Sequence, residues 1–175
     1  MHDNSMKLMK DFIEKYNVRT GTILDIGSLN LNGSYRALFP NAKYIGVDIQ
    51  AGKNVDVIMD SKEWKEIKDA DFVISGQTLE HVADIPGLIK SVYNAVVPDG
   101  IVCFIAPSSG PPHDYPVWVG HFSCEKTRDL FEAGGFETIE CTVSEVLPFK
   151  DVRYIGRKPH QKSLFRGKDK RRIED

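Results

Sequence analysis

The chain has 175 residues and is nearly neutral overall, with 23 lysine and arginine residues against 25 aspartate and glutamate residues. Its 41% hydrophobic and 27% charged content is typical of one globular domain, and no run approaches the ~18–20 uncharged apolar residues of a membrane span. Three widely spaced cysteines, Cys103, Cys124 and Cys141, form neither a disulfide framework nor a zinc motif. The sequence therefore excludes a membrane protein or secreted toxin and predicts a cytoplasmic chain without a metal site.

Hydrophobic periodicity predicts the elements in chain order. An amphipathic helix opens the chain within residues 1–17, and continuous apolar runs predict buried strands at 22–26, 43–47, 55–59, 71–75 and 101–106. A short helix is expected at 34–39, and longer helices follow Asp84 and Ser123, whose side chains suit helix N-caps. The triplet Pro98-Asp99-Gly100 predicts a turn. Two β-rich runs, around 138–146 and 152–155, follow without a helix between them.

This alternation of strand and helix predicts an α/β fold with helices on both faces of a doubly wound, Rossmann-like sheet. We expect seven strands, mostly parallel, with an antiparallel hairpin at the C-terminal edge. Residues 1–157 form the single predicted domain. Residues 158–175 carry seven lysine or arginine residues and three acidic ones, which predicts a basic, flexible tail, either simply solvated or bound to phosphate groups. The remaining chain is acidic, which argues against a nucleic-acid partner.

Ligands of such sheets bind beyond the carboxyl ends of the strands, so the residues that follow each strand are the candidates. The first strand runs into a loop that contains Asp25, Gly27 and Gly33, and glycine allows the backbone to approach a ligand closely. The G-x-G-x-x-G pattern of a dinucleotide site is absent from this loop. Asp48 ends the second strand about 20 residues later, at the spacing of an acid that accepts ribose hydroxyls. The combination predicts a nucleoside site.

These residues resemble the motifs of the class I S-adenosylmethionine-dependent methyltransferases. Asp25 and Gly27 match the start of the D-x-G-x-G-x-G motif, with Gly33 as its last glycine, although the middle glycine is missing and the loop is longer by two residues. Residues 72–82 are similar to the fourth-strand signature of the family, which ends in L-E-H-V, and Pro98-Asp99-Gly100 continues the match. The resemblance covers residues 22–155 and implies S-adenosylmethionine as the cofactor.

The resemblance also implies a cofactor site. Asp48 takes the position that holds the ribose, Ile49 is placed to pack on the adenine, and Asp60 with Ser61 takes the position at the adenine edge. The cofactor-binding residues predicted in full are Asp25, Gly27, Ser28, Asn30, Gly33, Asp48, Ile49, Asp60, Ser61 and Gln77. A few relatives hold a divalent ion near this fourth strand, but Gln77 stands where such a site needs a carboxylate, so no metal is expected.

Methyl transfer needs a base only where the acceptor arrives protonated, as a sugar hydroxyl does. His81, His113 and His121 are the candidate bases. The Gly/Pro-rich loop at 107–122 offers Asp114, Tyr115 and Trp118 as candidate substrate-binding residues.

We predict methyl transfer to a small or medium acceptor at oxygen. Two alternatives stay open: an inactive cofactor-binding module and an NAD-dependent oxidoreductase. Glu80 and His81 also allow a purely structural interpretation, in which they bond to local backbone. The sequence does not indicate the oligomeric state.

Overall fold

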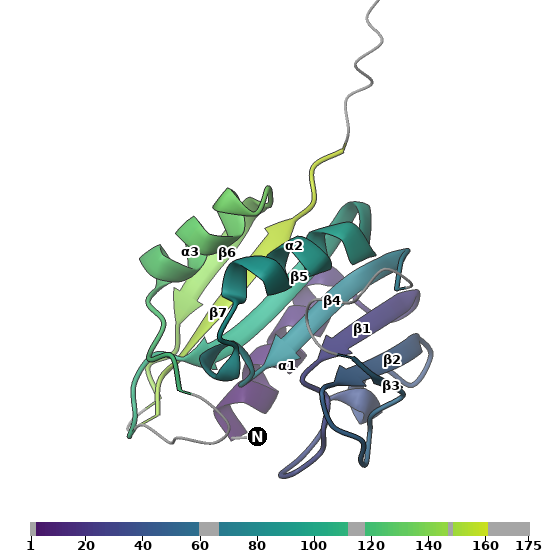
Figure 1. Ribbon diagram of the computed structural model, residues 1–175, viewed down its shortest axis with the longest axis horizontal. Coiled ribbons are helices and arrows are strands. Elements are labelled where there is room, and N and C mark those ends of the chain that lie inside the picture. Colours follow the sequence, from purple (N-terminus) through teal and green to yellow (C-terminus); the bar gives the residue numbers. More distant parts are fainter. Residues whose placement is uncertain (1–2, 60–66, 112–117, 147–148, 161–175) are drawn as a thin grey trace, which may run out of the picture.

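A single seven-stranded sheet organises the chain (Figure 1), whose computed structural model describes residues 3–59, 67–111, 118–146 and 149–160. The strand order is β3-β2-β1-β4-β5-β7-β6. Strands β1 to β5 pair in parallel, and β7 lies antiparallel to both β5 and β6. The strands are β1 (Thr22–Ile26), β2 (Lys43–Asp48), β3 (Val57–Ile58), β4 (Ala70–Gly76), β5 (Val96–Pro107), β6 (Glu137–Val143) and β7 (Asp151–Arg157). The predicted mostly parallel sheet with an antiparallel C-terminal edge is confirmed.

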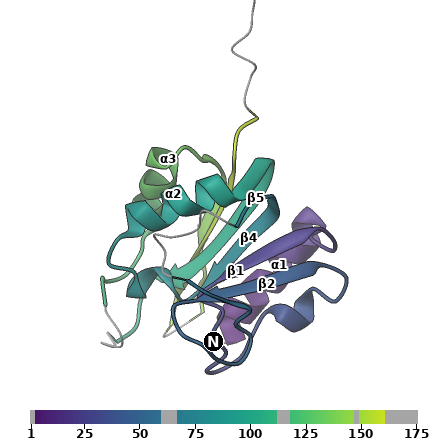
Figure 2. The same cartoon turned by 45° about the vertical axis from the view of Figure 1, so that its right-hand side comes forward.

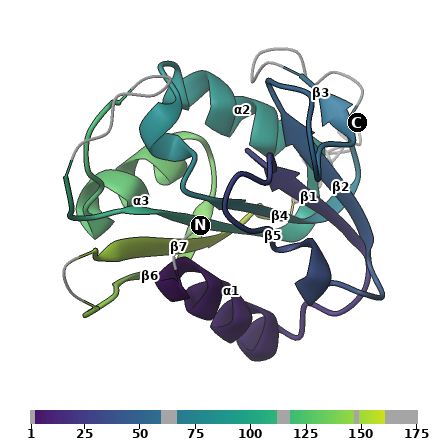
Figure 3. The same ribbon diagram turned by 90° about the horizontal axis from the view of Figure 1, so that it is seen from below.

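Helices cover both faces of this sheet (Figure 3). Helix α1 (Asp3–Tyr16) lies on one face, and α2 (Ile85–Ala95) and α3 (Cys124–Ala133) lie together on the other, an arrangement that Figure 2 shows from a second side. Met9 and Phe12 of α1 are fully buried in one apolar cluster, and Leu88 of α2 and Phe131 of α3 are buried in the second. Most residues of the central strands β1, β4 and β7 are therefore removed from water.

Local sequence explains where these helices begin. The Asp84 carboxylate accepts the Gly87 N–H at 3.0 Å, and the Ser123 hydroxyl accepts the Lys126 N–H at 3.1 Å. Both are N-cap bonds that satisfy otherwise unpaired amides of the first turn. The two predicted caps are confirmed.

Three details of the predicted order are wrong. The helix expected at 34–39 is only a single 3-10 turn, η1 (Arg36–Leu38), and residues 49–56 between β2 and β3 contain no helix, so strand and helix do not alternate throughout. Strand β3 has two residues instead of five, because it pairs only with Val47 and Asp48 at the sheet edge. The turn expected at 98–100 lies inside β5, where residues 97–100 bulge out of the pairing with β4.

The parallel strands direct their carboxyl ends to one edge of the sheet. The loop after β1 and the 3-10 turn η2 (Leu79–His81) after β4 lie at this edge, beside each other because β1 and β4 are hydrogen-bonded neighbours. Within the described residues, no helix is long and apolar enough to cross a membrane.

Candidate functional site

The loop after β1 and the turn after β4 enclose a cleft of about 280 Å³. It lies at the switch point of the sheet, where β1 has β2 on one side and β4 on the other. Its walls are made of Asp25, residues 27–29 and 31–35, Gly76, Gln77, Glu80 and His81. Residues singled out in two separate sequence segments, 25–35 and 76–81, therefore meet in one place.

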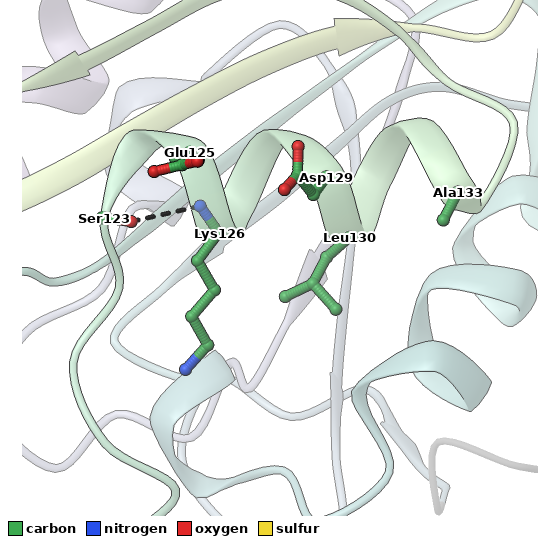
Figure 4. A pocket seen from close by; sticks show the side chains of 6 residues that line it. All are labelled: Ser123, Glu125, Lys126, Asp129, Leu130 and Ala133. Atoms are coloured by element: carbon green, nitrogen blue, oxygen red, sulfur yellow. Dashed lines mark hydrogen bonds between the residues drawn. The ribbon is translucent and has the colours of Figure 1, made fainter.

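A larger hollow runs along α3 and differs in kind (Figure 4). Its volume is about 480 Å³, but every residue that lines it comes from residues 123–133. The six lining side chains drawn in Figure 4 come from one short segment, α3 with its N-cap residue Ser123. We therefore place the candidate site in the cleft at the ends of β1 and β4.

Gly27 lets the chain turn at the end of β1. Its φ of +71° lies in the left-handed region, and a Cβ atom at this position would lie only 2.1 Å from Oγ1 of Thr78. The Gly27 and Ser28 amides donate to the Val47 carbonyl at 2.9 and 3.1 Å, which holds the loop against β2. Glycine is therefore required here both by backbone conformation and by space.

The rest of this loop is folded by its own polar groups. The Asn30 side chain accepts the Gly33 N–H at 2.8 Å, and Gly33 itself has a φ of +128°. The Asn54 amide donates to the Ser28 carbonyl at 2.8 Å. Ser28 and Gly33 line the cleft, whereas Asn30 does not, so the contact the structure gives Asn30 is a loop-folding one.

Asp48 lies beside the cleft, at the end of β2. Its two carboxylate oxygens accept the N–H groups of Leu29 at 3.0 Å and Gln50 at 3.1 Å. A carboxylate has about four acceptor sites, so two stay available for hydroxyl groups of a ligand. Ile49 and Leu31 are 56% and 75% exposed, which leaves apolar surface beside these acceptors. This combination fits a nucleoside.

Asp25 is a buried carboxyl in the cleft wall. It is 3% exposed and accepts a hydrogen bond from the Tyr44 hydroxyl of β2. Burial raises the pKa of Asp25 to about 7, against the opposing effects of the Tyr44 hydrogen bond and the Arg36 charge. Sequence reasoning identified Asp25 but missed Tyr44, because only the parallel pairing of β1 with β2 brings the two together.

Gln77 directs the chain out of β4. Its φ of +59° is left-handed, which is uncommon for a residue other than glycine. The Gln77 N–H donates to the Ile105 carbonyl at 2.8 Å, and its side chain donates to the Asp151 carboxylate at 2.9 Å. Unusual backbone conformations of this kind concentrate at functional sites.

Glu80 and His81 complete the cleft. Glu80 is fully buried, yet neither carboxyl oxygen has a hydrogen-bond partner within the described structure. Burial, together with the smaller effect of the nearby Asp151 charge, raises the pKa of Glu80 to about 8. The His81 Nε2 atom lies 3.8 Å from Glu80 Oε1. The sequence analysis left Glu80 out of the site, although its place beside His81 in the L-E-H-V segment was a usable signal.

Of the other candidate histidines and substrate-binding residues, some lie within the described residues and some lie outside them. Trp118 is half-buried, and its ring centre lies 6.4 Å from that of His81 and 5.2 Å from that of His121. His121 is exposed and does not line the cleft, which leaves His81 as the one cleft-lining histidine among the described residues. Asp60, Ser61, His113, Asp114 and Tyr115 lie outside the described residues.

The sequence match decides the family. The model of the methyltransferase domain family matches residues 3–141, which is most of the chain. The chain belongs to this methyltransferase family. The identification as a class I S-adenosylmethionine-dependent methyltransferase is confirmed, and the assignment agrees with S-adenosylmethionine as the cofactor. No curated protein matches the chain by sequence.

Solved structures share the fold at low sequence identity. The 1,6-didemethyltoxoflavin-N1-methyltransferase of Burkholderia thailandensis, with bound S-adenosylhomocysteine, is 15% identical, with a TM-score of 0.73 over 89% of this chain and 78% of that one. The N-methyltransferase NodS of Bradyrhizobium japonicum, also with S-adenosylhomocysteine, is 12% identical, with a TM-score of 0.66 over 88% and 87%. The [4+2]-cyclase SpnF is 12% identical, with a TM-score of 0.68 over 87% and 81%. These similarities establish the fold, which also serves a cyclase.

Proposed function

We propose that the chain transfers a methyl group from S-adenosylmethionine to a hydroxyl oxygen of a small or medium acceptor. The observation that carries this proposal is that one cleft is lined both by the loop after β1 and by His81. Membership of the methyltransferase family supports the reaction class, and the histidine supports an acceptor that arrives protonated. Bound S-adenosylmethionine would supply a methyl group on a positively charged sulfur. The sulfur is the leaving group and becomes a neutral thioether, so it needs no acid.

The chain's own residues would bind the cofactor along the β1–β2 side of the cleft. Asp48 has two free acceptor sites for the ribose hydroxyls, and the exposed side chains of Ile49 and Leu31 offer apolar surface to the base. Ser28 and Gly33 would border the amino-acid end of the cofactor. Asp60 and Ser61 stay predictions for the adenine edge.

His81 would act on the acceptor at the β4 side. The neutral imidazole removes the hydroxyl proton as the oxygen forms its bond to the methyl carbon, and the proton stays on the ring until solvent takes it up. Glu80 Oε1, 3.8 Å from Nε2, is placed to stabilise the positively charged ring when its carboxyl is ionised. Trp118 offers a flat apolar surface next to the ring for the acceptor. Most of the rate acceleration would then come from the alignment of the acceptor oxygen with the methyl group.

Calorimetry tests the cofactor half of the proposal. We expect S-adenosylmethionine and S-adenosylhomocysteine to bind and NAD not to bind. Asp48→Asn should weaken binding on the order of 10- to 100-fold, because hydrogen bonds to a charged group are lost. Asp129→Asn on the exposed side of α3 is the matched control and should bind as the wild type does. Binding of NAD alone would mean an oxidoreductase, and equal affinity of Asp48→Asn would refute the ribose assignment.

A panel of hydroxyl and amine acceptors with labelled S-adenosylmethionine tests the acceptor half. We expect transfer to hydroxyl compounds, and we expect His81→Gln to lower kcat on the order of 10²- to 10⁴-fold with unchanged cofactor affinity. His121→Gln is the control outside the cleft. Transfer to amines only would overturn the oxygen assignment, an outcome to include because two of the similar structures are N-methyltransferases. Cofactor binding without transfer to any acceptor would favour an inactive binding module.

A further inference from the structure

The first turn of α1 makes polar contacts that its apolar packing does not require. The helix is already fixed to the sheet by Met9, Phe12 and Ile13, which are buried in the cluster that includes residues of β1, β4, β5 and β7. Asn4 and Ser5 precede this stripe. Asn4 is hydrogen-bonded to Asp151, the first residue of β7, which pairs with the last residue of β5, and Ser5 is hydrogen-bonded to Tyr35, which lines the cleft. Their partners show what these bonds do.

Asn4 is connected to the cleft through one intermediate residue. Its side-chain amide donates to Asp151 Oδ2 at 2.7 Å and to the Ser144 hydroxyl at 2.8 Å, and the Asp151 N–H donates to the same hydroxyl at 3.0 Å. The second oxygen of Asp151, which is 2% exposed, accepts the Gln77 amide at 2.9 Å. Asn4 therefore fixes the orientation of the buried carboxylate that holds the Gln77 side chain in the cleft wall.

Ser5 reaches the same point by a second route. Its hydroxyl is hydrogen-bonded to the Tyr35 hydroxyl at 2.5 Å, and both side chains are buried. Tyr35 lines the cleft and packs against Gly76, where a Cβ atom would lie 2.1 Å from its hydroxyl oxygen. The two routes from α1 thus end at adjacent residues, Gly76 and Gln77.

These two residues determine how the chain leaves β4. Gln77 adopts its left-handed φ there, and η2 with Glu80 and His81 begins two residues later. A strained backbone conformation persists where surrounding contacts enforce it. The bonds from Asn4, through Asp151, and from Ser5, through Tyr35, are such contacts.

We propose that Asn4 and Ser5 are positioning residues of the methyl-transfer site. They act through Asp151 and Tyr35 to hold the Gly76–Gln77 wall and, with it, the turn that carries His81. The inference rests on the proposed function, since it concerns the same cleft. It assigns the N-terminal helix a role in ligand binding even though neither Asn4 nor Ser5 lines the cleft.

An exchange of donor and acceptor between Asn4 and Asp151 tests the first route. Asn4→Asp sets two carboxylates against each other, and Asp151→Asn removes the charge that accepts from two amides. In the double variant, an amide at 151 can donate to a carboxylate at 4 and still accept from Gln77, so the two bonds of this route and the net charge are retained. We expect each single variant to weaken S-adenosylhomocysteine binding about tenfold or more and the double variant to restore it to within about threefold of the wild type. Lys7→Ala, exposed on the same helix, should bind as the wild type does.

Titrations at 20 °C, well below the melting temperature of each variant, separate positioning from folding. Ser5→Ala tests the second route and should weaken binding about threefold to tenfold while the circular dichroism spectrum stays unchanged. Singles that melt earlier but bind S-adenosylhomocysteine normally would overturn the inference, as would a double variant that binds no better than either single. Failure of the wild type to bind would instead refute the proposed function and, with it, the inference.

Discussion

Asp25 and Glu80 are two buried carboxyls in the wall of one cleft, and they differ in their partners. Asp25 lies in β1 and accepts a hydrogen bond from the Tyr44 hydroxyl of the neighbouring strand. Glu80 lies in the turn after β4, and its oxygens have no hydrogen-bond partner in the described structure. Burial raises the pKa of both groups, to about 7 for Asp25 and about 8 for Glu80.

This difference in partners indicates two different roles for a buried carboxyl, a group whose burial lowers the stability of the fold. Burial of a polar atom without a partner lowers stability, so a fold keeps such an atom where another requirement outweighs the loss. The bond from Asp25 joins β1 to β2, which is a structural use. Among the described residues, the Glu80 carboxyl has no hydrogen-bond partner that would join two elements, and it lies beside the imidazole of His81, which fits the role that we propose for His81 as a base. Three predictions test this distinction.

The largest effect is expected from Glu80→Gln in the pH dependence of stability. Because the folded-state pKa lies near 8, above the ordinary value of 4.5, the folded state keeps a proton that the unfolded state releases. The contribution of this protonated carboxyl to the free energy of unfolding is therefore complete below about pH 4.5 and is lost as pH rises through about 8. Relative to the wild type, Glu80→Gln should gain stability on the order of 3–5 kcal/mol between about pH 5 and pH 9. Urea unfolding at several pH values measures the gain.

Glu125→Gln, on the exposed surface of α3, controls for the loss of a carboxyl as such and should leave this pH dependence unchanged. If the stability difference between Glu80→Gln and the wild type were the same at all pH values, Glu80 would have an ordinary pKa and would not be a buried carboxyl without partners.

A smaller effect is expected when the structural carboxyl is removed. Near pH 4, the folded wild type keeps the Asp25 proton and its raised pKa costs little stability. At this pH, Asp25→Ala leaves the Tyr44 hydroxyl without its acceptor and opens a small cavity between β1 and β2, which should cost about 2–4 kcal/mol. Asp129→Ala on α3 should stay within ~0.5 kcal/mol of the wild type in the same urea titration. A loss below ~1 kcal/mol for Asp25→Ala would show that the hydrogen bond contributes little to the fold.

The sequence predicted the strands, the caps at Asp84 and Ser123, and several cleft residues, because each follows from a local signal. Continuous apolar runs indicate buried parallel strands, and Gly27, Gln77 and His81 lie in the segments that follow such runs. These positions converge because parallel strands end at one edge of a sheet.

Contacts between distant segments could not be predicted in this way. The bond from Asn4 to Asp151 joins residues 147 positions apart, and it depends on the insertion of β7 between β5 and β6. No local pattern encodes that strand order. The lack of hydrogen-bond partners for Glu80 within the described structure could not be predicted for the same reason. It depends on which groups every element packed against the turn directs toward Glu80.

The smallest effect is expected from Tyr44→Phe, which makes Asp25 resemble Glu80. The ring stays in place over the Arg36 guanidinium, whose centre lies 4.4 Å from the ring centre, while the bond to Asp25 is lost. We expect a loss of about 1–2 kcal/mol. The Tyr44 bond lowers the pKa of Asp25, so its removal raises that pKa further above the unfolded value. Stability should therefore fall more steeply for Tyr44→Phe than for the wild type as pH rises through about 7. Urea unfolding at several pH values measures this difference. If the stability difference between Tyr44→Phe and the wild type stayed constant across this pH range, the Tyr44 bond would not distinguish the ionised Asp25 carboxyl from the neutral one.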